Sequence, residues 1–167
     1  MNTQQEYRFK VGDFAVFPGH GVGKICAVQI QEIVPNQISS YYVIQQKSTG
    51  PKILVPVDRE DKIRKLSTKE EIEKVFQFLT IQEFKIDRSV WNRRQRDYLE
   101  KIHTGHLLEI ADVFRTLKAL EKLKVLCFSE KKMLSSCKNL IIDEMVLGLR
   151  LDHQSVEKKI EACFLES

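Results

Sequence analysis

The residues best suited to bind a charged partner surround Trp91, the only tryptophan in the chain. Four arginines lie within five residues of it: Arg88, Arg93, Arg94 and Arg96. A helix that begins here presents unpaired first-turn amides, which favour an anion such as phosphate. The arginines can add contacts to the same backbone, and an exposed indole can wedge against a base step in the minor groove. The pattern therefore indicates a surface for nucleic acid.

A purely structural interpretation of this segment stays open. A tryptophan is usually buried at least in part, so Trp91 could belong to a core while the arginines form a solvated face. A second basic pair, Lys131-Lys132, follows Ser129 and Glu130 at another expected helix start. By itself this pair is typical of a solvent-facing surface, but it repeats the arrangement around Trp91.

The remaining reactive residues predict no enzyme, metal site or cofactor. The glycine-rich segment 18–24 departs from the spacing of a phosphate-binding loop and favours a turn between strands. His20 has no nucleophile or carboxylate that the sequence pairs with it. The four cysteines lack CxxC spacing and are expected to be small buried hydrophobic residues in a reducing compartment: Cys26, Cys127, Cys137 and Cys163.

The first third of the chain is expected to form β structure. Short runs rich in β-branched and aromatic residues alternate with turn signals such as Pro35-Asn36. Strands are expected within residues 9–17, 22–34, 41–44 and 53–57. This spacing predicts a small Tudor- or SH3-like β-barrel over residues 1–66.

From residue 67 the pattern changes to helices. Two overlapping capping boxes occur there, Ser67 with Glu70 and Thr68 with Glu71. Gly105 is expected to end one helix, and further helix starts are expected at Ser89, Ser129 and Asp152. The fold class is therefore α+β with two domains, the barrel being followed by an all-α helical bundle over residues 67–167.

The β domain has more apolar residues than a small barrel must bury. The run Ile53-Leu54-Val55 places apolar side chains on both faces of one strand, and Ile44 adds to the excess. A strand of a partner protein could pair with the edge of such a sheet. Alternatively, the helical domain could cover the outer face.

Composition narrows the class of protein. The chain has 167 residues, of which 43% are hydrophobic and 30% charged, as in globular domains. No apolar run approaches the length of a membrane span, and the polar segment 1–10 does not resemble a signal peptide. A cytoplasmic location is therefore expected. The net charge of +4 is too mild to indicate nucleic acid without local clustering.

Ordered motifs in both halves resemble the CarD/CdnL family of bacterial transcription regulators, whose first domain is shared with the transcription-repair coupling factor. The resemblance extends from about residue 9 to about residue 165. The order and spacing of the motifs agree across both domains. The motifs are Phe9–Asp13, Val16–Gly23, Lys52–Val57, Val90–Arg94, Tyr98–Ile102, Thr104-Gly105, Glu109–Val113 and Ser129–Leu134.

The resemblance implies a non-enzymatic regulator in which a Tudor-like domain docks on the β subunit of bacterial RNA polymerase. The helical domain would bind promoter DNA with weak sequence specificity, with Trp91 wedged into the minor groove at the upstream edge of the transcription bubble. The effect would be to stabilise the open complex. The residues implied are Trp91, Arg93, Arg94, Arg96 and Lys131 or Lys132 for DNA, and Gln31, Ile44, Leu54 and Pro56 for polymerase.

One departure from the family and one rival function complete the expectations. Some members carry arginine at the positions of Gln31 and Leu54, so a more apolar and less salt-dependent polymerase contact is expected here. The rival is a protein-interaction module that binds polymerase or another partner without touching DNA, with Trp91 in its core. A monomer that does not associate with membranes is expected in either case.

Overall fold

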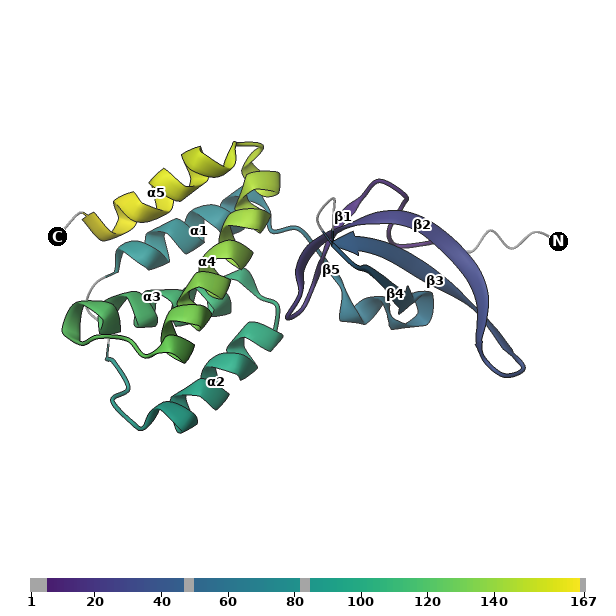
Figure 1. Cartoon of the computed structure of the whole chain (residues 1–167). Coiled ribbons are helices and arrows are strands. Elements are labelled where there is room, and N and C mark those ends of the chain that lie inside the picture. Colours follow the sequence, from purple (N-terminus) through teal and green to yellow (C-terminus); the bar gives the residue numbers. More distant parts are fainter. Residues whose placement is uncertain (1–5, 47–49, 82–84, 166–167) are drawn as a thin grey trace. The chain divides into compact units, whose positions relative to one another are not determined.

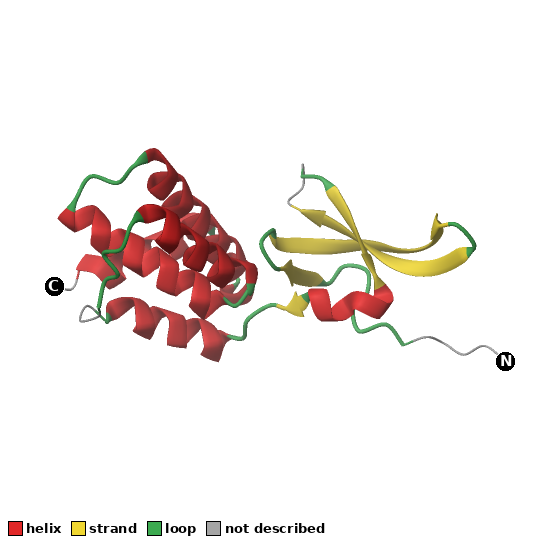
Figure 2. Ribbon diagram, turned by 90° about the horizontal axis from the view of Figure 1, so that it is seen from below, coloured by secondary structure: helices red, strands yellow, loops and turns green. Residues whose placement is uncertain are grey.

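The computed structural model describes residues 6–46, 50–81 and 85–165. The chain divides into two compact units, Met1–Leu66 and Ser67–Ser167 (Figure 1). Figure 2 colours the described elements by secondary structure: the first unit has strands and a short helix, and the second has helices. The α+β class expected from the sequence is therefore confirmed.

The first unit is built on one antiparallel sheet with the strand order β4-β3-β2-β1-β5. Because β4 lies at one edge and β5 at the other, the described strands form a sheet with two edges, and the closed barrel expected from the sequence is not seen. A 3-10 helix, η1, joins β4 to β5. The elements are β1 (Phe14–Phe17), β2 (Gly21–Val34), β3 (Gln37–Gln46), β4 (Lys52–Pro56), η1 (Val57–Lys62) and β5 (Arg64–Lys65).

Local turn chemistry sets the limits of these strands. The β2–β3 hairpin reverses at Pro35 and Asn36, where Asn36 adopts a φ of 64°, a left-handed conformation that asparagine tolerates. The first strand begins later than expected, at Phe14, because Gly12 turns the chain with a φ of 97°. The Gly12 amide donates to Ile25 O at 2.8 Å, so this turn is joined to β2.

Side chains on one face of the sheet form the core cluster of the first unit. Tyr42 and Ile44 of β3 point to this face with Val55 of β4, and all three are at most 3% exposed. Phe9 packs edge-to-face on Tyr42, with ring centroids 5.8 Å apart. The chain that precedes β1 therefore closes this side of the sheet.

In the described part of the second unit, five helices surround one core that draws on all of them. Helix α1 starts with one of the two overlapping capping boxes, in which Thr68 accepts from the Glu71 amide at 3.2 Å and Glu71 accepts from the Thr68 amide at 2.7 Å. Ser67 instead donates its amide and hydroxyl to Glu144. The helices are α1 (Lys69–Thr80), α2 (Trp91–His103), α3 (Leu107–Leu123), α4 (Phe128–Leu149) and α5 (His153–Leu165).

Two other helix limits are confirmed. Gly105 follows the end of α2 with a φ of 72° and donates its amide to Ile102 O. Asp152 accepts from the Ser155 amide at 2.9 Å and so caps the start of α5. Gly148 near the end of α4 lets that helix approach α1 closely, since a Cβ there would lie 2.5 Å from the buried Ile72.

Candidate nucleic-acid and protein interfaces

The chain before α2 is shaped by a local turn. Asp87 accepts from the Ser89 amide at 2.8 Å and from its hydroxyl at 3.0 Å, and no described side chain accepts a capping hydrogen bond from the first turn of the helix. Val90 occupies the N-cap position and Trp91 is the first helical residue. The expected cap at Ser89 is therefore wrong by one residue, while the prediction that Trp91 lies in the first turn of a helix is correct.

Trp91 is partly buried, and part of its surface stays accessible. Its ring packs against the core of the helical unit and lies 6.3 Å from the ring of Tyr98, about two turns further along α2. The Arg94 guanidinium carbon lies 5.5 Å from the indole centroid, within the range of a cation–π contact. The indole therefore packs against the edge of the core, beside Tyr98 and Arg94 of its own helix, and keeps part of its surface accessible.

Arg94 differs from the expectation that it touches phosphate. The residue is 5% exposed, its Nε donates to Ser89 O at 2.9 Å, and its Nη2 donates to Glu130 at 3.0 Å. A guanidinium buried and engaged in this way cannot reach a DNA backbone outside the unit. Arg94 instead connects the turn before α2 to the start of α4.

Glu130 binds two cationic side chains and a backbone amide at the start of α4. It is fully buried and accepts from Lys124 Nζ at 2.9 and 2.8 Å, from the Cys127 amide at 2.9 Å and from Arg94. Burial by itself raises the pKa of a carboxyl group, but the hydrogen bonds from Lys124, Cys127 and Arg94 outweigh it and lower the pKa of Glu130 to about 2. Glu130 is therefore ionised at neutral pH.

Glu130 also sets the start of α4. It stands at the third helical position, and Cys127 takes the N-cap position in place of the expected Ser129. Lys131 and Lys132 follow directly in the helix, and both are exposed. Helix α4 therefore begins earlier than expected, and its two lysines directly follow the residue that pairs with Arg94 of α2.

Four of the basic residues expected to bind DNA have exposed side chains. Arg93 and Arg96 on α2 are exposed, as are Lys131 and Lys132 on α4. Within the described ranges none of the four forms an ion pair, in contrast to Arg94, Lys101, Arg115 and Lys138 of the same unit. The starts of α2 and α4 together carry exposed positive charge around a partly accessible indole.

The β unit separates the four residues expected to contact polymerase. Along β3, residues 39, 41 and 43 share one face, and their partners in the ladders are Gln31 on β2 and Pro56 and Leu54 on β4. Gln31, Leu54 and Pro56 therefore lie on the same face, opposite the core. Ile44 points to the other face and is 1% exposed, so its side chain is not available as a contact.

Strand β4 is an edge of the sheet and pairs only with β3 among the described strands. Its outward-facing Leu54 is 39% exposed, whereas Val55 beside it is 3% exposed. The apolar side chains on both faces of the Ile53-Leu54-Val55 run thus have different surroundings. An unpaired edge with an accessible apolar side chain is suited to the addition of a strand from another protein.

Several features were not anticipated from the sequence. Cys26 and Cys127 are exposed, contrary to the expectation of four buried cysteines, whereas Cys137 and Cys163 are buried. Burial raises the pKa of the Cys137 thiol to about 12. The anchoring role of Glu130 was also missed; the spacing of three residues between Cys127 and Glu130, typical of a capping interaction, is the signal that could have indicated it.

No group of three histidine, cysteine, aspartate or glutamate side chains in the part of the chain that the structure describes is arranged to hold a metal ion. Among the same residues, no helix has both the length and the apolar character needed to cross a membrane.

These features define a two-unit protein with a separate candidate binding surface on each unit. Residues 74–161 match the family described as CarD, C-terminal domain, and residues 9–67 match the CarD-like/TRCF RID domain, which is Tudor-like. The chain is also 31% identical over 140 residues to the Bacillus subtilis (strain 168) protein named "Putative transcription factor YdeB", covering 82% of this chain and 90% of that protein.

The chain therefore belongs to the CarD family, and the resemblance noted from its motifs is confirmed. This family comprises transcription-associated factors that interact with RNA polymerase, and it is not a known enzyme family.

Proposed function

We propose that the protein binds the β subunit of RNA polymerase through its β unit and promoter DNA through its helical unit, and thereby stabilises the open promoter complex. The observation that carries the DNA half is the partly accessible Trp91 at the start of α2, together with four exposed basic residues near the starts of α2 and α4 that form no ion pair with any described residue. An apolar wedge beside cations that bind phosphate is the arrangement by which minor-groove proteins unstack a base step.

The proposed DNA contact requires the indole to keep one orientation. Tyr98 and Arg94 flank the ring, and Arg94 is itself fixed by Ser89 O and Glu130. A wedge that is already ordered loses little conformational entropy on binding. Arg93, Arg96 and Lys131 or Lys132 would then contribute backbone contacts that carry no sequence information, which is consistent with weak sequence specificity.

The polymerase contact is proposed at the β4 edge and the face that carries Gln31, Leu54 and Pro56. Since Gln31 and Leu54 are uncharged, this contact would depend less on salt than one made by arginines. Tethering through polymerase would raise the local concentration of the helical unit near the promoter, so that a few phosphate contacts suffice.

The test is the lifetime of the open complex on a ribosomal RNA promoter with purified bacterial polymerase. Trp91→Ala should reduce the lifetime to that measured without the protein, while the β subunit is still bound. Leu99→Ala is the matched control, because Leu99 lies on the same helix and is 39% exposed. Unchanged lifetime with Trp91→Ala would instead support the interaction module without DNA contact, which the packing of Trp91 on the core also favours.

A further inference from the structure

The connection between α3 and α4 leaves a row of apolar side chains in solvent. Leu123 is 60% exposed, Val125 is 86% exposed and Phe128 is 80% exposed. Single exposed apolar residues are common on protein surfaces, but three within six positions form a local apolar surface. Phe128 is the first residue of α4, so its backbone is fixed in a helical conformation.

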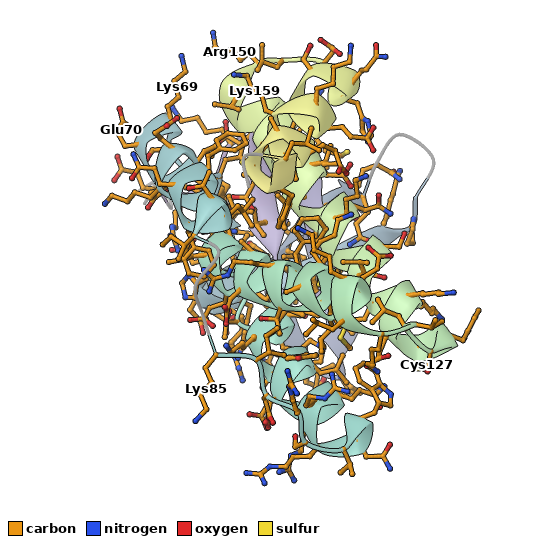
Figure 3. All side chains as sticks on the ribbon, turned by 90° about the vertical axis from the view of Figure 1, so that its left-hand side faces the viewer. Lys69, Glu70, Lys85, Cys127, Arg150 and Lys159 are labelled. Atoms are coloured by element: carbon orange, nitrogen blue, oxygen red, sulfur yellow. The ribbon has the colours of Figure 1, made fainter. Side chains whose placement is uncertain are left out.

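An ion pair joins the start of α4, which carries Phe128, to the start of α2, which carries Trp91. Arg94 stands three residues after Trp91 on α2, Glu130 stands two residues after Phe128 on α4, and their side chains meet at 3.0 Å. Side chains from the starts of the two helices therefore meet, and each helix begins with an aromatic residue. Cys127, labelled in Figure 3, marks the outer end of α4 where Phe128 follows.

The charges around Phe128 favour a polyanion as the occupant. Lys131 and Lys132 are exposed and form no ion pair within the residues described, and Arg93 on the neighbouring helix is in the same state. Of the acidic groups nearby, Glu130 is buried under Arg94 and Lys124 and Asp87 accepts from Ser89, whereas Asp97, one turn after Arg93 on α2, is exposed.

A stretch of exposed apolar side chains bordered by unpaired cations fits nucleic acid. The rings or aliphatic groups can contact bases while the cations contact phosphates.

We propose that Phe128 is a second DNA-contacting side chain, which packs against a nucleobase of the promoter next to the base step contacted by Trp91. This inference rests on the proposed function and adds a residue to the same site. Because Phe128 is mostly exposed, it needs no rearrangement of the core to reach DNA. Trp91, which packs partly on the core, would fix the position, and Phe128 would extend the contact along the strand.

The first experiment compares open-complex lifetimes with the full-length protein carrying Phe128→Ala or Phe128→Tyr. Loss of a base–aromatic contact should shorten the lifetime by at least about 5-fold for Phe128→Ala, whereas Phe128→Tyr should keep most of the effect. Leu108→Ala is the matched control, because Leu108 is an apolar residue that is 47% exposed at the start of α3, at the end of that helix away from Leu123. Thermal melting of each variant should remain that of the wild type, as expected for an exposed side chain.

The second experiment places a photo-crosslinking residue, p-benzoylphenylalanine, at position 128, 91 or 108 in the complex with polymerase and promoter DNA. Crosslinks to DNA from positions 128 and 91, on neighbouring nucleotides, are expected. DNA crosslinks from position 91 alone, with a normal lifetime for Phe128→Ala, would overturn this inference and leave the proposed function intact. The absence of DNA crosslinks from both positions would overturn the DNA contact as a whole.

Discussion

Nη2 of Arg94 lies 3.0 Å from a carboxylate oxygen of Glu130, and the side chains of both residues are almost completely buried. The two residues are 36 positions apart in the chain, on α2 and α4. Their contact holds together the two helix starts that carry Trp91, Phe128 and the exposed basic residues. The buried ion pair therefore positions the residues of the candidate DNA surface and is not itself exposed to a ligand.

Replacing Glu130 should destabilise the helical unit. Glu130→Gln leaves the Arg94 guanidinium buried without a charged partner, a change that typically costs about 3–5 kcal/mol of unfolding free energy. Chemical denaturation of the wild type and the variant measures this difference. Lys138→Gln is a suitable control, because Lys138 is paired at the α4–α5 contact with a partly exposed side chain and should cost much less. Equal stabilities for the Glu130 variant and the wild type would contradict the anchoring role.

The same carboxylate should make stability depend on pH in the acid range. The pKa of Glu130 is lowered from its ordinary value of 4.5 to about 2 in the folded protein, so the unfolded chain binds the proton more readily. The stabilisation is complete above pH 4.5 and is lost as the pH falls through about 2. Its full size is about 3 kcal/mol from the shift in pKa.

This contribution is obtained by subtracting the pH profile of Glu130→Gln from that of the wild type, because other carboxylates titrate in the same range. The difference in unfolding free energy should shrink between pH 5 and pH 2.5. A difference that stays constant over this range would show that the hydrogen bonds of Glu130 do not hold its pKa low.

Arg93 and Arg94 should respond to substitution in different ways, although they are adjacent. Arg93 is exposed and unpaired in the described structure, so Arg93→Ala should weaken binding to the polymerase–promoter complex and make the plot of log affinity against log salt shallower by about 1. Arg94→Ala should instead lower the melting temperature. A lower melting temperature for Arg93→Ala, or a changed salt slope without loss of stability for Arg94→Ala, would reverse these assignments.

A charge at Leu54 should break the polymerase contact and leave the fold intact. Leu54 is 39% exposed on the outer face of the edge strand β4, so Leu54→Asp places a carboxylate where an apolar contact is proposed. Binding of the isolated β subunit, measured by pull-down or calorimetry, should be lost. Val11→Asp, at a 62% exposed apolar residue before β1, is the matched control. Retained binding with Leu54→Asp would rule out this face as the docking surface.

Local sequence signals determined much of the secondary structure. Turn residues such as Asn36 and Gly105 adopt positive φ angles where the sequence indicated a turn or a helix end. The position of Trp91 in the first turn of a helix was also predictable from its neighbours. These features depend on a few consecutive residues, whose conformational preferences are independent of the rest of the chain.

Only the tertiary structure decided which residues of each cluster are accessible. In the sequence Arg94 resembles the arginines around it, but in the structure it is buried and paired with Glu130 of another helix. Ile44 and Leu54 were both plausible contacts, and the register of β3 with β4 placed them on opposite faces.

Two capping boxes overlapped at the start of α1, and the structure resolves the choice. Glu144, 77 positions away, binds Ser67 and leaves Thr68 as the cap. Each of these outcomes depends on contacts between distant segments, and short-range preferences cannot specify such contacts.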